Sequence, residues 1–182
     1  MDKSQYKNVY VFVEQRDGVV QNVALELLGK ARELADALHE QVVALLLGKG
    51  VKDKADELIA AGADVVLSIE ADELAQYTTE PYAQAITQVI HERKPSILLI
   101  GATSIGRDLG PRLSARIGTG LTADCTGLDI SEDGDLLMTR PAFGGNLMAT
   151  IICKEHRPQM STVRPGVMRA KACLLYTSDA AD

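Results

Sequence analysis

The sequence of 182 residues is poor in aromatic side chains and has no excess of basic charge. Aromatic residues make up only 4% of the chain while 46% of the residues are hydrophobic, so the core must be aliphatic. A net charge of −6 argues against nucleic-acid binding, which needs a concentrated basic surface. Apolar runs such as Val42–Leu47 and Ile97–Ile100 are far too short to span a bilayer.

Cysteine and histidine are also scarce, and neither shows the spacing of a metal site. Cys125, Cys153 and Cys173 are an odd number, are widely separated and include no C-x-x-C, which favours a reduced cytoplasm over a disulfide framework or a zinc site. The first eight residues lack the apolar region of a secretory signal. No Ser/His/Asp set or pair of carboxylates stands out, so we expect no autonomous catalysis.

Apolar runs and amphipathic segments alternate through the first hundred residues. Four runs read as buried strands, and one-face apolar patterns between them predict helices. This alternation predicts an α/β fold, a Rossmann-like three-layer αβα arrangement with a mostly parallel sheet. The predicted strands are Asn8–Glu14, Gln41–Leu47, Asp64–Ser68 and Ser96–Ile100, and the predicted helices are 23–38, 52–61 and 81–90.

The pattern changes after Ile117. Four short strand-like pieces follow, separated by turns too short to contain crossover helices. The C-terminal third therefore predicts β-hairpin additions that extend or flank the parallel sheet. The four pieces are Thr126–Ile130, Leu136–Ala142, Met148–Cys153 and Gln159–Val163.

The loop after the fourth strand is the first candidate for a ligand site, because such loops bind ligands in open α/β sheets. Gly101–Gly106 is similar to a phosphate-binding loop, but Arg107-Asp108 stands where Lys-Ser/Thr should be, which argues against phosphate hydrolysis. Two interpretations remain open. Thr103, Ser104, Gly106 and Arg107 could serve an adenylate or a partner, or the small residues could simply permit a tight strand-to-helix turn.

The helix after this loop carries Pro111, which is tolerated only near a first turn, so the sequence predicts that the helix begins close to Arg107–Leu109. Asp108 and Arg112 are spaced as an i, i+4 ion pair. Downstream, Gly118–Ala123 matches G-x-G-x-x-A letter for letter. It follows a helix instead of a strand, however, so we interpret it as a chance match.

Three segments resemble the α subunit of the electron transfer flavoproteins. They are GATSIGRDLGPRLSARIGTGLTADCT from Gly101, RPAFGGNLMA from Arg140 and RPQMSTVRPGVM from Arg157, and the resemblance covers residues 1–168. It implies the N-terminal domain of that subunit, a Rossmann-like unit of the adenine nucleotide α-hydrolase type. Residues 169–182 continue no pattern and are expected to be a non-native-looking tail or a remnant of truncation.

The resemblance implies an electron carrier without catalysis of its own, formed as a heterodimer with a β subunit in the bacterial cytoplasm. It would take electrons from flavin dehydrogenases, such as the acyl-CoA dehydrogenases of fatty acid β-oxidation, and pass them to a quinone oxidoreductase or a bifurcating partner. FAD would be held mainly by the α subunit's C-terminal domain, which has no counterpart here. AMP or a second FAD would belong to the β subunit, which moves Thr103–Arg107 towards a structural or interface role.

Arg140, Phe143 and Asn146 combine a cation, an aromatic ring and a flexible turn at a hairpin tip, while Arg164 lies at the exit from the domain. Ordinary turn chemistry would explain both stretches. Their coincidence with the family's segments favours a partner interface. The alternative function is a stand-alone adenine-nucleotide-binding module that resembles the universal stress proteins.

Overall fold

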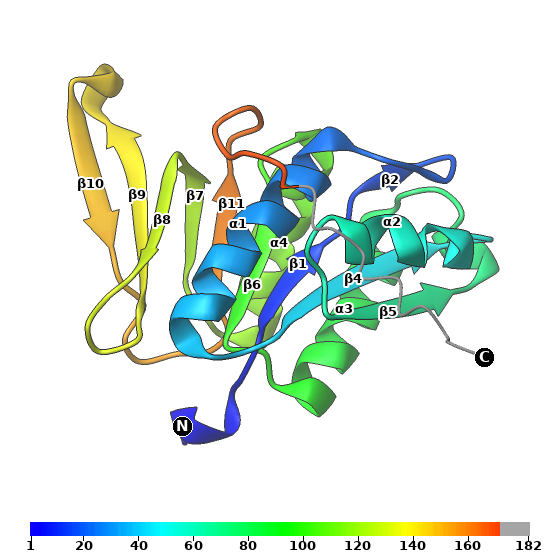
Figure 1. The fold of residues 1–182 in the computed structure, drawn as a ribbon, viewed down its shortest axis with the longest axis horizontal. Coiled ribbons are helices and arrows are strands. Elements are labelled where there is room, and N and C mark those ends of the chain that lie inside the picture. The colour runs from blue at the N-terminus through cyan, green and yellow to red at the C-terminus, as the bar shows by residue number, and fades with distance from the viewer. Residues whose placement is uncertain (172–182) are drawn as a thin grey trace, which may run out of the picture.

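The computed structural model describes residues 1–171 and has the predicted three-layer α/β architecture around a six-stranded sheet (Figure 1). The strand order is β5-β4-β1-β6-β11-β7, and every neighbouring pair is parallel. The mostly parallel sheet is therefore confirmed. Its strands are β1 (Val9–Phe12), β4 (Val42–Gly48), β5 (Val65–Glu70), β6 (Ile97–Gly101), β7 (Leu121–Cys125) and β11 (Gln159–Val163).

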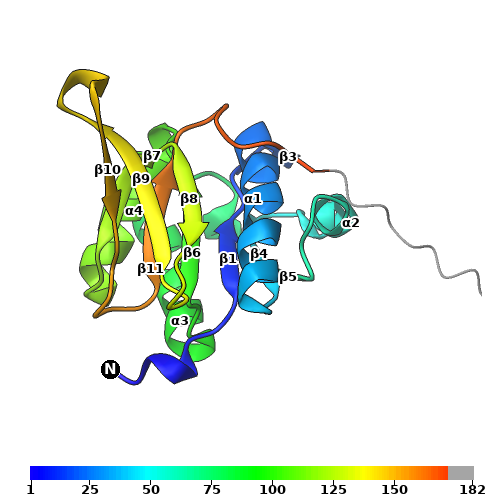
Figure 2. The ribbon, with the colours of Figure 1, turned by 60° about the vertical axis from the view of Figure 1, so that its left-hand side comes forward.

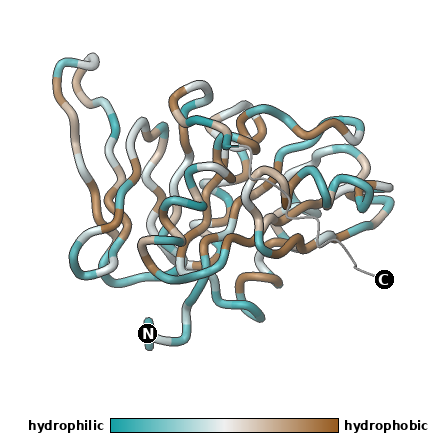
Figure 3. Tube along the Cα trace, in the orientation of Figure 1, coloured by the Kyte–Doolittle hydropathy of each residue, from teal (hydrophilic) through white to brown (hydrophobic). Residues whose placement is uncertain are grey.

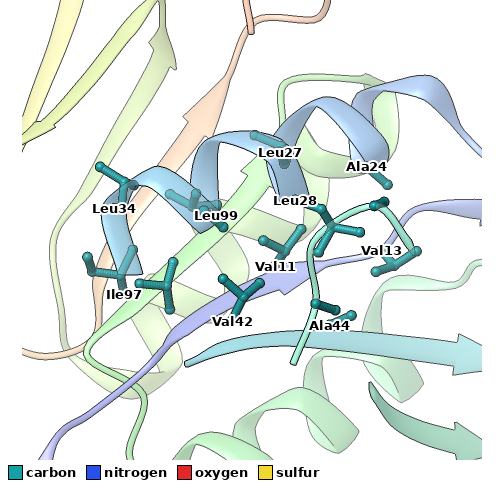
Figure 4. Close-up of a cluster of buried hydrophobic side chains, with 14 of the residues drawn as sticks. Val11, Val13, Ala24, Leu27, Leu28, Leu34, Val42, Ala44, Ile97 and Leu99 are labelled. Atoms are coloured by element: carbon teal, nitrogen blue, oxygen red, sulfur yellow. The ribbon is translucent and has the colours of Figure 1, made fainter. Parts of the chain in front are cut away.

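Helices cover both faces of this sheet. On one face, α1 (Asn22–Leu38) and α2 (Ala55–Ala60) pack on alternate residues of the strands, and Figure 4 shows Leu27 and Leu28 of α1 above Val11. On the other face, α3 (Thr79–Arg93) and α4 (Ser104–Ile117) enclose a second cluster. Because the central strands are buried on both sides, hydrophobic residues run continuously along them, as the brown stretches in Figure 3 show.

The predicted hairpin additions form a separate three-stranded antiparallel sheet with the order β10-β9-β8. Its base packs beside α1 through Leu128, Leu136 and Met138, while the β9–β10 hairpin projects away from the body (Figures 1 and 2). These strands are β8 (Gly127–Ile130), β9 (Leu136–Ala142) and β10 (Leu147–Ile151). The smaller elements are the hairpin β2 (Gln15–Arg16) and β3 (Val19–Val20) and the 3₁₀ turns Lys3–Gln5, Lys52–Lys54, Asp72–Leu74 and Phe143–Gly145.

Two strands differ from the prediction. Gln159–Val163 does not continue the hairpins, because it returns to the central sheet as β11 and lies between β6 and β7. Its polar residues can be buried there because they find partners: Gln159 accepts a 2.8 Å hydrogen bond from the backbone N–H of Leu136. Leu121–Cys125, for which no strand was predicted, is the edge strand β7, and its polar residues conceal the pattern.

Helix α4 begins at Ser104, three residues before the predicted start. Thr103 caps it, since its hydroxyl accepts a 3.1 Å hydrogen bond from the N–H of Gly106. Pro111 consequently lies inside the helix, on its exposed side, and the prediction from proline placement is wrong. The cap decides where the helix starts, and the proline's missing N–H falls within the helix.

The predicted ion pair between Asp108 and Arg112 is absent among residues 1–171, because tertiary contacts compete for both side chains. Asp108 accepts hydrogen bonds from the hydroxyls of Tyr77 and Thr79, which lower its pKa. Arg112 and Arg116 instead bind Glu80, at 2.8 and 2.5 Å. These contacts join α4 to the N-terminal end of α3.

After β11 the chain crosses the outer side of α1 (Figure 1). The N–H of Gly166 donates to Glu26 at 2.9 Å, and Lys171 forms a 2.7 Å ion pair with Glu33. Between them the backbone of Arg169 lies so close to Gly29 that a Cβ there would stand 2.4 Å from the Arg169 carbonyl oxygen. Of the expected tail at 169–182, residues 169–171 thus lie along α1, and residues 172–182 are outside the described part.

Candidate functional site

The sheet has its topological switch point between β1 and β6. From β1 the chain builds outward to β4 and β5, then crosses back and adds β6 on the other side of β1. In open α/β sheets, ligands bind in the crevice that this reversal leaves at the carboxyl ends of the strands. The first residues beyond the two strands here are Val13 and Glu14 after β1 and Ala102 and Thr103 after β6.

A buried carboxylate occupies this crevice. Glu14 is only 4% exposed, and one of its oxygens accepts a 2.6 Å hydrogen bond from the hydroxyl of Thr103. Removing a charged group from water costs several kcal/mol unless it is compensated, and the positive end of the α4 dipole supplies part of that compensation. Glu14 therefore stands where an anionic ligand of this helix would otherwise lie.

The hydroxyl of Thr103 has no proton left to donate to a phosphate. It donates its single proton to Glu14 and accepts the N–H of Gly106. A phosphate brought to this end of α4 would also be repelled by the Glu14 carboxylate. The residues of the crevice therefore do not fit a phosphate-bearing cofactor.

The glycines of the loop are explained by packing. A Cβ at Gly106 would lie 1.7 Å from the carbonyl oxygen of Gly101, so only glycine lets α4 approach β6 so closely. At Gly101 a Cβ would stand 2.7 Å from a methyl group of Val23. The spacing that is similar to a phosphate-binding loop thus serves the contact between a helix and a strand.

Ser104 and Arg107, the other two side-chain candidates of this loop, lie on opposite sides of it. Ser104, exposed at the first position of α4, helps to line a cavity of about 390 Å³ together with Gln15 and Tyr77. The Tyr77 hydroxyl is committed to Asp108, and partial burial together with that carboxylate raises the pKa of Tyr77. Arg107 is exposed and lies on the opposite side, towards β7.

Asp124 on β7 is influenced by three arginines from separate sequence segments, one of which contacts it directly. Arg164, just after β11, holds both carboxylate oxygens of Asp124, with hydrogen bonds of 2.7 and 3.2 Å. This bond is the main cause that lowers the pKa of Asp124, and the nearby charges of Arg107 and Arg140 lower it further.

The β9–β10 hairpin carries the remaining candidates. Phe143 lies at its tip with 85% of its surface exposed, and Asn146 is exposed beside it. Arg140 does not lie at the tip, because it pairs with Ala149 within the strands. The hairpin exposes an unusual set of large apolar side chains, namely Phe143, Leu147, Met148 and Ile151. Exposed apolar patches of this kind mark interaction sites.

The described residues give little support for a metal site or a reactive thiol. No group of three or more His, Cys, Asp or Glu side chains within residues 1–171 is arranged to hold a metal ion. Cys125 is fully buried, and burial raises the pKa of its thiol, which makes it a poor nucleophile. Cys153 is half-buried, and Cys173 lies outside the described residues. None of the helices in residues 1–171 is both long enough and apolar enough to cross a membrane.

Comparison with protein-family models assigns the fold and its segments to one family. The model described as "Electron transfer flavoprotein domain" matches residues 9–180. The chain belongs to the electron transfer flavoprotein family. The resemblance found in the sequence is therefore confirmed.

Curated relatives extend this comparison. The chain is 58% identical over 168 residues to the electron transfer flavoprotein subunit alpha of Clostridium acetobutylicum, covering 92% of this chain and 50% of that protein. It is 48% identical over 170 residues to the lactate dehydrogenase (NAD(+),ferredoxin) subunit LctC of Acetobacterium woodii, covering 93% and 41%. It is 45% identical over 167 residues to protein FixB of Rhizobium meliloti, covering 90% and 47%. The chain spans about half the length of the curated relatives it matches.

The sequence did not reveal the two carboxylates at the centre of these sites, Glu14 and Asp124. Glu14 follows a buried strand, which is a recognisable signal, but its contact with Thr103 joins residues 89 positions apart. Asp124 lies in a strand that was not predicted and has a positive φ of 59°, so no local pattern singles it out.

Proposed function

We propose that this chain is part of the α subunit of an electron transfer flavoprotein, in which it acts as a scaffold and as the surface that binds a β subunit. The observation that carries the proposal is the apolar hairpin β9–β10. Phe143, Leu147 and Met148 are 85%, 59% and 58% exposed, although side chains of this size are normally buried. Membership of the family and relatives named as α subunits support the same role.

The shape of the hairpin suits a docking element. Strand β10 pairs only with β9 in the described sheet, so one of its edges is open to another chain. Phe143 adopts a positive φ of 48°, an uncommon conformation for a bulky residue that holds its ring at the tip. Together the open edge and the presented ring form a surface on which a partner strand or groove would bury apolar area.

In the intact protein, the proposed role is to carry electrons through FAD from flavin dehydrogenases to a quinone oxidoreductase or to a bifurcating partner. FAD would be held mainly by the second half of the α subunit, and AMP or a second FAD by the β subunit. Acyl-CoA dehydrogenase of fatty acid β-oxidation is the proposed donor, in the cytoplasm of a bacterium. The name of LctC, which includes NAD(+) and ferredoxin, supports the bifurcating alternative.

Co-purification tests the interface. The chain is co-expressed with a tagged β subunit from a bacterial electron transfer flavoprotein, and the amount retained is measured for the wild type and for Phe143→Ser. We expect retention to fall at least fivefold for the variant. Ile59→Ser is the control, since Ile59 is another exposed apolar side chain, at 38%, but lies on α2. Equal retention of the wild type and Phe143→Ser would remove the hairpin from the interface.

Calorimetric titration with AMP, ATP and FAD tests the remainder of the proposal. We expect no micromolar binding by the chain alone, because Glu14 and the committed hydroxyl of Thr103 oppose a phosphate in the crevice. Micromolar binding of AMP or ATP would instead favour a stand-alone nucleotide-binding module and would contradict the scaffold as a complete description.

A further inference from the structure

We propose that the crevice between β1 and β6 binds an ammonium group on a short aliphatic stem, with the carboxylate of Glu14 as its counter-ion. This inference does not depend on the proposed electron-transfer role, because it concerns a different edge of the chain from the hairpin and needs no partner subunit. It starts from a charged side chain whose hydrogen-bonding capacity is only partly used.

Only 4% of the surface of Glu14 is exposed. Among residues 1–171 a single donor, the Thr103 hydroxyl, reaches one of its two carboxylate oxygens. A carboxylate offers about four acceptor positions. The second Glu14 oxygen is not among the fully buried, unpaired side-chain atoms of residues 1–171, so a donor that enters from solvent can reach it.

Space for the donor lies directly beside the carboxylate. Glu14 and Thr103 form part of the wall of a cavity of about 390 Å³, a volume within the range of small-ligand sites. Most of the remaining wall is aliphatic, which suits a hydrocarbon stem. Its apolar members are Val19, Val20, Val23 and Pro165, and its polar rim consists of Arg16, Gln21 and Asn22.

The charges of the site select the sign of the ligand. An anion would face the Glu14 carboxylate and would find the Thr103 proton already donated. Two features oppose a cation: Arg16, which is exposed on the rim, and the positive end of the α4 dipole. The long side chain of Arg16 can turn towards water, and the dipole amounts to only about half a unit charge against the full charge of Glu14. We therefore expect Arg16→Ala to tighten the binding of an amine and Glu14→Gln to weaken it.

The probe is n-butylamine, titrated into the isotope-labelled 182-residue chain at 150 mM salt and followed residue by residue through amide chemical shifts. Because the chain carries a net charge of −6, a monoamine and added salt limit non-specific attraction. We expect shifts centred on Glu14, Val20 and Thr103, a loss of affinity of at least fivefold for Glu14→Gln, and no change for the exposed control Glu132→Gln. Neutral 1-butanol should bind at least fivefold more weakly than the amine.

Three results would overturn the proposal: shifts spread over the acidic surface, equal binding of butanol and butylamine, or unchanged affinity in Glu14→Gln.

A lysine or arginine side chain of a partner protein could supply the same cation. That source is distinguished by the co-purification assay. If Glu14→Gln lowers retention by a β subunit while butylamine neither binds the wild type nor competes, the carboxylate serves a partner and the small-ligand site is wrong. Loss of butylamine binding with normal retention leaves the proposed function untouched.

Discussion

The guanidinium of Arg164 donates two hydrogen bonds, of 2.7 and 3.2 Å, to the carboxylate of Asp124, and this contact joins the end of β11 to the end of β7. The contact lowers the pKa of Asp124 below its usual range. A group with a lowered pKa in the folded state contributes stability above its unfolded pKa and loses that contribution as the pH falls through the folded value.

Asp124→Asn should therefore be less stable than the wild type at pH 7. The difference should shrink as the pH falls below about 4, the usual pKa of an unfolded aspartate, and on through the lowered pKa of the folded Asp124. Asparagine tolerates the positive φ of 59° at this position, so backbone strain does not confuse the comparison. Urea midpoints measured from pH 3 to pH 7 check this. Asp133→Asn, in the exposed turn after β8, is the control, and parallel curves for the wild type and Asp124→Asn would contradict the ion pair.

Gly106→Ala should be severely destabilising. The added Cβ would lie 1.7 Å from the Gly101 carbonyl oxygen, and this backbone atom cannot move away without shifting α4 from β6. We expect a loss of about 3 kcal/mol in the free energy of unfolding, at the upper end of overpacking effects. Chemical denaturation measures it. Gly120→Ala is the matched control, because its nearest new contact, the Cys153 sulfur at 3.6 Å, is an ordinary one, and it should change stability by less than about 1 kcal/mol.

Arg157 and Asp135 form a 2.8 Å ion pair with side chains only 8% and 13% exposed. Arg157 also donates to the carbonyl oxygens of Cys153 and His156, so it fastens the returning loop to the base of the antiparallel sheet. Arg157→Met leaves Asp135 buried without its partner and should cost about 3 kcal/mol. Arg112→Met, which removes a largely exposed pair with Glu80, should cost far less. Similar denaturation midpoints for the two variants would show that burial does not strengthen the first pair.

Gly29→Ala tests the path of the chain after β11. Alanine favours the helix by about 1 kcal/mol, but its Cβ would stand 2.4 Å from the Arg169 carbonyl oxygen and displace residues 169–171 from α1. We expect global stability to change by no more than about 1 kcal/mol while amide protection falls in residues 166–171. Hydrogen exchange separates the two effects. Glu33→Gln removes the Lys171 ion pair without blocking the path, and it should cause a smaller loss of protection.

The fold was largely predictable because its strongest signals are local. Buried parallel strands are continuous apolar runs, and amphipathic helices repeat with their own period, so the strands β1, β4, β5 and β6 and the helices between them were found within a few residues. β7 escaped because it is an edge strand whose polar residues interrupt the run. β11 was found as a strand but was expected in a hairpin that extends or flanks the sheet, whereas it is a parallel strand inside the central sheet, because its neighbours β6 and β7 are chosen by tertiary packing.

The candidate sites were less predictable, since each depends on residues distant in the chain. The sequence singled out Thr103 and Arg107 as possible ligand contacts, but only the fold shows that Thr103 is bound to Glu14 and that the charge of Arg107 helps to lower the pKa of Asp124. The exposure of Phe143 also could not be read from its neighbours, because an aromatic ring in a turn can equally well pack inward. Whether these residues bind a partner stays a prediction.

The amino-acid sequence by itself determined the α/β class, the aliphatic core and the family, because periodicity, composition and short motifs are properties of the linear chain. Tertiary structure decided the rest. It placed Gln159–Val163 between two strands of the central sheet, brought Arg164 to the carboxylate of Asp124 and set Glu14 at the N-terminal end of α4. The physical reason is that hydrogen bonds and ion pairs form wherever folding brings partners within about 3 Å, whatever their separation along the chain.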